Sequence, residues 1–91
     1  MKSVRVRISG RVQGVWFRAW TKRQATALGL DGWVRNCIDG NVEALFAGSD
    51  EAVDAIIVQC WNGPPRACVR AISSEQDESP KASGFHVLAN C

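Results

Sequence analysis

A short glycine-bounded segment, residues 10–18 (Gly-Arg-Val-Gln-Gly-Val-Trp-Phe-Arg), carries the residues of this sequence that are best suited to bind an anion. It lies between an alternating run that predicts a strand at 4–8 and a periodic run that predicts a helix at 17–28. Backbone N–H groups in such a turn can converge on an anion, and the helix N-terminus adds unpaired donors and partial positive charge. Arg18 supplies a planar guanidinium that can bind two phosphate or carboxylate oxygens at once. The segment therefore predicts a site for a phosphate or an anion of similar shape.

Length and composition limit the classes of protein to which the sequence can belong. The 91 residues predict one domain, residues 1–91, and the 46% of hydrophobic residues are typical of a globular protein. The net charge of +2 is too small to predict a nucleic-acid partner. No long apolar segment that would predict a signal peptide or a membrane-spanning helix is present. We therefore expect no membrane association and a cytoplasmic location.

Hydrophobic periodicity and turn residues predict the elements that position this segment. Strands are expected at 4–8, 30–37, 42–47, 67–74 and 84–89, with helices at 17–28 and between Ser49 and Gly63. Asp39-Gly40 predicts a hairpin turn, and Ser49 is a suitable N-cap for the second helix. This order predicts an α+β fold, a ferredoxin-like βαββαβ sandwich. Its antiparallel sheet would have four to five strands, with two helices on one face.

Side-chain patterns within these elements give more specific expectations. The buried side of the first helix is expected to comprise Phe17, Trp20, Thr21, Gln24 and Leu28. In the fourth strand, Val69 and Ala71 share a face that excludes Ile72, and this imperfect alternation predicts a bulge. In the last strand, Phe85 and Val87 are expected to face inward.

The cysteines do not predict a metal site. Neither a Cys-x-x-Cys pair nor a histidine besides His86 is present, so zinc is not expected. In a cytoplasmic protein the four thiols are expected to be reduced and partly buried, with Cys91 exposed. A disulfide between Cys37 and Cys91 remains an alternative if the last strand lies beside the second, because connectivity cannot be read from sequence.

Three segments together resemble one known family. They are Gly10-x-Val-Gln-Gly-Val-x-Phe-Arg18, Gly32-Trp-Val-Arg-Asn36 and Asp39-Gly-x-Val42. In these segments, in order and at the right spacings, the sequence resembles the acylphosphatase family. A fourth segment, Gly63-Pro-Pro-x-Ala-x-Val69, resembles a further family segment ahead of the fourth strand. The resemblance extends over essentially the whole chain.

The resemblance implies hydrolysis of the carboxyl–phosphate bond of acyl phosphates to a carboxylate and inorganic phosphate, without a metal or a cofactor. Carried over by position, Arg18 would bind the phosphoryl group and Asn36 would hold and orient the attacking water. The backbone amides expected to complete the phosphate-binding loop are those of Val12, Gln13, Gly14, Val15, Trp16 and Phe17. The substrate phosphate would itself accept the proton of the water.

The residue chemistry agrees with this implication. Catalysis of phosphoryl transfer depends largely on positioning and charge stabilisation, which a loop of donors can supply. An asparagine offers both a donor and an acceptor, as a residue that holds a neutral water must. No pair of carboxylates is placed for general acid–base chemistry.

Two other classes of function remain as alternatives. One is a non-catalytic anion-binding or regulatory module, although we expect a free-standing enzyme because nothing before Met1 or after Cys91 is expected to be regulated. We also expect the enzyme to be a monomer. The other is an RNA-binding domain of the same fold. The run at 4–8 alternates arginine with aliphatic residues but offers no aromatic ring for base stacking, so no nucleic-acid partner is expected.

Overall fold

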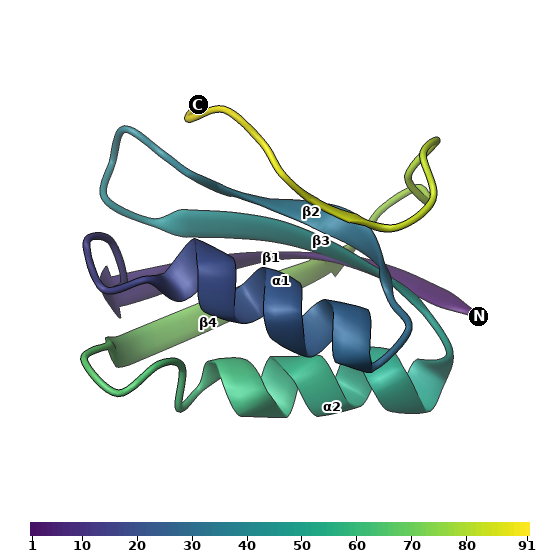
Figure 1. The fold of residues 1–91 in the computed structure, drawn as a ribbon, viewed down its shortest axis with the longest axis horizontal. Coiled ribbons are helices and arrows are strands. Elements are labelled where there is room, and N and C mark those ends of the chain that lie inside the picture. The colour runs from purple at the N-terminus through teal and green to yellow at the C-terminus, as the bar shows by residue number, and fades with distance from the viewer.

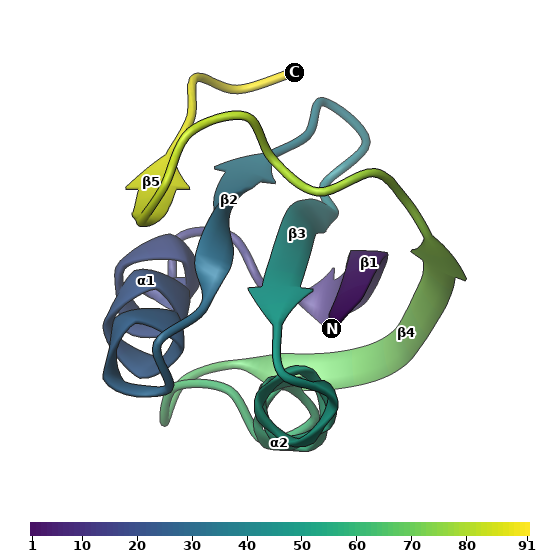
Figure 2. The same ribbon diagram turned by 90° about the vertical axis from the view of Figure 1, so that its right-hand side faces the viewer.

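The computed structural model describes residues 1–91 as one five-stranded sheet that two helices cover on one face (Figures 1 and 2). The elements, in chain order, are β1 (Lys2–Arg11), α1 (Phe17–Ala27), β2 (Asp31–Asn36), β3 (Val42–Gly48), α2 (Asp50–Cys60), β4 (Cys68–Gln76) and β5 (Phe85–Val87). The expected ferredoxin-like α+β arrangement is confirmed, with β5 as an added edge strand.

The direction of the strands determines where the ends of the elements meet. The strand order is β4-β1-β3-β2-β5; β3 is antiparallel to both β1 and β2, whereas β5 is parallel to β2. Strands β1, β2 and β5 therefore run in the same direction, and their C-terminal ends lie at one end of the sheet. The loop that leads into α1, the β2–β3 turn and the C-terminal end of the chain all lie at the left of Figure 1.

A bulge separates two registers between β1 and β4. Ser9 pairs with Ala71 but Gly10 pairs with Val69, which leaves Arg70 without an opposite residue. The expected bulge is therefore confirmed, but the expected faces are not. The extra residue turns Val69 and Ile72 toward the core, whereas Ala71 is exposed.

The helices pack on the sheet through small and medium-sized side chains. In α1 the buried residues are Phe17, Thr21 and Ala25. Trp20, Gln24 and Leu28 are only half-buried. The row of α1 side chains that is fully buried is therefore narrower than expected. At the start of α2, the Ser49 hydroxyl accepts a hydrogen bond of 3.2 Å from the Ala52 N–H, which confirms the expected N-cap. Neither helix is long and apolar enough to cross a membrane.

The last strand is shorter than expected and has only one buried residue. Phe85 packs against Phe46 in the core, with 5.7 Å between the ring centroids. Val87 is 44% exposed, so the expectation that it faces the core is wrong. The reason is its position at an edge of the sheet beside α1, where its side chain borders an open cleft.

Candidate active site

An open cleft of about 500 Å³ lies where the C-terminal ends of β1, β2 and β5 meet the start of α1. The residues that line it are Val12, Gly14, Trp16, Phe17, Arg18, Ala19, Asn36 and Val87. The structure thus places Arg18 and Asn36 in the same cleft, although they lie on different elements. Of the expected loop residues, Gln13 and Val15 do not line it: Val15 is buried in the core.

The backbone between β1 and α1 offers a row of unused donors. No N–H group of residues 12–16 donates a hydrogen bond to an acceptor in the protein. The first bond of α1 runs from the Trp20 N–H to the Trp16 carbonyl (3.0 Å), so the N–H groups of 17–19 have no intrahelical acceptor either. Neither a side-chain cap nor an acidic residue occupies this end of the helix. The segment is therefore able to bind an anion through backbone donors.

Two residues with a left-handed backbone conformation shape this loop. Gly14 has φ of +74° and Trp16 has φ of +67°, and both lie just before the helix. Glycine adopts this conformation freely, whereas for a residue such as tryptophan it costs about 1–2 kcal/mol. Because such strain persists where the surrounding structure imposes it, and often at functional sites, its occurrence here is consistent with a binding loop. Trp16 is 80% exposed and lies at the rim of the cleft.

The side chains of Arg18 and Asn36 are both available to a ligand. Arg18, in the first turn of α1, forms no ion pair; its Nη1 donates to Asn90 Oδ1 at 3.3 Å. Asn36 ends β2, and its carbonyl accepts the Cys91 N–H at 2.9 Å, whereas its side-chain amide has no hydrogen-bond partner. The cleft therefore combines an unneutralised positive charge with a free amide.

The acylphosphatase family model matches residues 4–87 of the sequence. This chain belongs to the acylphosphatase family. It is 52% identical over 85 residues to an acylphosphatase from Rhodospirillum rubrum, covering 93% of each chain. It is 54% identical over 83 residues to one from Rhizobium meliloti, covering 90% of this chain and 87% of that one. The crystal structure of the Bacillus subtilis acylphosphatase superposes with a TM-score of 0.91 at 35% identity, covering 97% of this chain and 99% of that one.

Membership in the acylphosphatase family shows that the chain is an enzyme, a hydrolase that acts on acyl phosphates. It also confirms the resemblance that the sequence segments indicate.

Gln13 makes contacts beside this cleft that its place in the sequence does not reveal. Its Nε2 donates to the carbonyls of Cys37 (2.8 Å) and Asn41 (2.9 Å), in the turn between β2 and β3. The side chain therefore ties the loop to the turn that follows Asn36. The sequence predicts Gln13 only as part of the loop, because its partners lie on another element.

Asn90 is a residue near the site that sequence reasoning missed. The segment 88–91 continues alongside β2: the Leu88 N–H donates to the Val34 carbonyl, and the Cys91 N–H to the Asn36 carbonyl, both at 2.9 Å. This pairing brings the Asn90 side chain to Arg18. No motif in the last residues signals the contact, because it arises from the pairing of the backbone.

Proposed function

We propose that Arg18 and the backbone amides of residues 12–17 bind the phosphoryl group of an acyl phosphate, and that Asn36 orients the water that attacks phosphorus. The products are a carboxylate and inorganic phosphate. The observation that carries this proposal is the row of N–H groups without acceptors beside a guanidinium that forms no ion pair, in one cleft.

The charge on the phosphoryl group supports this assignment. As the P–O bond to the acyl group breaks, negative charge spreads over the equatorial oxygens of phosphorus. Fixed backbone donors and a guanidinium can stabilise that charge without reorganising. Arg18 lies in the first turn of α1, so its charge adds to the positive end of the helix dipole.

Asn36 and the substrate phosphate are the groups that can position the attacking water and accept its proton. The amide of Asn36 can accept from the water and donate to it, which fixes the oxygen for attack in line with the bond that breaks. None of the residues that line the cleft has a carboxylate, a thiol or an imidazole. The site thus offers neither a set of metal ligands nor a side-chain base, and we propose that the phosphate accepts the proton and that no metal or cofactor is used.

The apolar part of the cleft suits the acyl group. Trp16 and Val87 lie at its rim, and both are well exposed. An acyl chain or ring placed between them would remove apolar surface from water. All these groups come from one chain, so we propose that a monomer is the active species.

The proposal is tested by hydrolysis of benzoyl phosphate in the presence of EDTA, with the wild type and the Arg18→Ala and Asn36→Ala variants. We expect the wild type to turn over and each variant to lose on the order of 10²-fold or more in kcat/KM, as for the loss of a group that stabilises or positions the transition state. Arg23→Ala is the matched control, because Arg23 lies on the same helix, exposed and outside the cleft.

The outcomes separate the parts of the proposal. Near-wild-type turnover by a folded Arg18→Ala variant would show that the phosphoryl group binds elsewhere. Turnover retained by Asn36→Ala would remove that residue from the positioning of water. Loss of wild-type activity on addition of EDTA would contradict the metal-independent reaction.

A further inference from the structure

Cys37 and Cys91 lie side by side, although they are far apart in the sequence. The Cys91 N–H donates to the Asn36 carbonyl and the Cys91 carbonyl accepts from the Ile38 N–H, both at 2.9 Å. These two bonds flank Cys37, so Cys91 is its direct partner across two parallel segments. Neighbouring parallel segments lie about 4.8 Å apart. That spacing is within the range of about 4.4–6.8 Å that disulfides need between Cα atoms.

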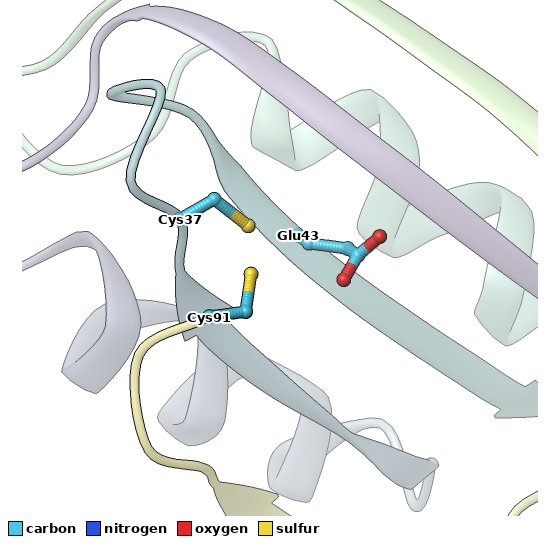
Figure 3. A group of neighbouring side chains, drawn as sticks. All are labelled: Cys37, Glu43 and Cys91. Atoms are coloured by element: carbon cyan, nitrogen blue, oxygen red, sulfur yellow. The ribbon is translucent and has the colours of Figure 1, made fainter.

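The two side chains lie on the same face and point toward each other (Figure 3). Both sulfur atoms and a carboxylate oxygen of Glu43 lie within 4.8 Å of one another. Cys37 is buried and Cys91 is exposed, and both are free thiols. A change of side-chain rotamer is therefore sufficient to bring the sulfur atoms into bonding distance.

We propose that Cys37 and Cys91 form a reversible intramolecular disulfide that fastens segment 88–91 to the end of β2. The bond would hold Asn90, the residue before Cys91, beside Arg18. The disulfide itself does not depend on the proposed role of Arg18. Neither Cys37 nor Cys91 lines the cleft in which we propose that the substrate binds, so the disulfide is a separate modification site.

The surroundings of Glu43 favour a disulfide over a metal site. Glu43 Oε1 accepts from Arg35 Nε (2.9 Å) and Arg35 Nη2 (2.6 Å), and Glu43 Oε2 accepts from Arg7 Nη2 (3.4 Å). Its carboxylate is therefore already neutralised by two guanidinium groups. A metal ion would have to displace them, and without Glu43 only two sulfur ligands remain.

The oxidant in this reaction is a low-molecular-weight disulfide such as oxidised glutathione. The exposed Cys91 attacks as its thiolate and forms a mixed disulfide, which releases the first glutathione thiolate. Cys37 then loses its proton and attacks Cys91 Sγ, which releases the second. The protein loses two electrons and two protons, and one glutathione disulfide becomes two thiols.

The environment of Cys37 sets the rate of the second step. Burial above all, then the hydrogen bond and charge of Cys91 and the charge of Glu43, raise the pKa of Cys37 to about 11, against the opposing charge of Arg7. At neutral pH the buried thiol is therefore mostly protonated. Once Cys91 is in the mixed disulfide its contributions are lost, whereas burial, the largest cause, remains. We therefore expect the closure of the disulfide to become faster as the pH rises above neutral.

The test treats reduced protein with oxidised glutathione and counts free thiols after acid quenching and denaturation. Apart from any mixed disulfide of the exposed Cys68 with glutathione, we expect two of the four thiols, Cys37 and Cys91, to disappear. Digestion after glutamate, at Glu43 and Glu51, separates Cys37 from Cys60. The peptide with Cys37 should then be linked to the peptide with Cys91. The cross-link closes a long loop, so the melting temperature should rise on the order of 10 °C relative to the reduced form.

Two variants serve as controls. Cys91→Ser should keep its Cys37 thiol free and show no shift in melting temperature. Cys68→Ser, which removes the other exposed cysteine, should still form the bond. The proposal is overturned if the wild type keeps four thiols, or if Cys91 stops at the mixed disulfide with glutathione. Stoichiometric zinc retained by the reduced protein would also overturn it, in favour of a metal site.

Discussion

Gln13 is the residue whose side chain joins the two halves of the candidate active site. The loop with the free N–H groups follows β1, whereas Asn36 lies on β2, and β3 separates these strands in the sheet. The two hydrogen bonds from Gln13 Nε2 cross this gap to the carbonyls of Cys37 and Asn41. Because both partners are carbonyls, the position requires a donor rather than merely a polar side chain.

We therefore expect Gln13→Ala to weaken the competitive inhibition by inorganic phosphate about 10-fold while the protein stays folded. Two hydrogen bonds worth about 0.5–1.5 kcal/mol each account for a loss of that size. Gln13→Glu has the same shape but cannot donate, so it should lose at least as much. Gln24→Ala, on the half-buried side of α1, is the control. Wild-type inhibition constants in both Gln13 variants would show that the loop holds its shape without this link.

Among the elements, β2 depends on a close approach that only glycine permits. Gly32 has φ of +139°, and a Cβ placed on it would lie 1.8 Å from the Leu45 carbonyl oxygen. A side chain there would push β2 away from β3. Since β2 ends at Asn36, the displacement would also reach the cleft.

Gly32→Ala should accordingly lower the free energy of unfolding by about 2–3 kcal/mol, as expected for a substitution that overpacks the interior. Urea unfolding followed by tryptophan fluorescence measures this loss. Gly40→Ala is the matched control: Gly40 also has a positive φ, of +92°, but a Cβ there has nothing within 4 Å. Its loss should be smaller, about 1 kcal/mol, from backbone strain alone. Equal losses in the two variants would show that β2 can move aside without cost.

The sequence could predict the features that depend on local patterns, but not those that depend on backbone pairing between distant segments. The strands, the helices and the loop before Arg18 follow from local periodicity and turn residues, so their positions were predictable. The exposure of Val87 and the Asn90–Arg18 contact depend on how the segment after β4 pairs with β2. That pairing is set by backbone hydrogen bonds, which leave no pattern in side-chain types. For the same reason, sequence alone could not decide whether Cys37 and Cys91 meet.

At the scale of the whole molecule, one core links the sheet to both helices. Cys60, at the end of α2, is 1% exposed in that core, and its burial raises the pKa of the thiol to about 12. In the unfolded chain the same thiol ionises near pH 8.5. Between these values the folded protein retains a proton that the unfolded chain loses, so stability must fall as the pH rises. Below about pH 8.5 the contribution of Cys60 is fully present.

The last prediction follows from this difference. Over the alkaline range, Cys60 should lower the free energy of unfolding by about 1.4 kcal/mol for each pH unit. Cys60→Ala removes this dependence but also some packing, so it should be less stable than the wild type at pH 7 and lose less stability up to pH 11. Urea unfolding at several pH values, under reducing conditions, measures both slopes. Cys37 is present in both proteins, so its titration cancels from the difference. Parallel slopes would mean that Cys60 is reached by solvent and ionises in the folded protein, and hence that the end of α2 opens while the rest of the fold stays closed.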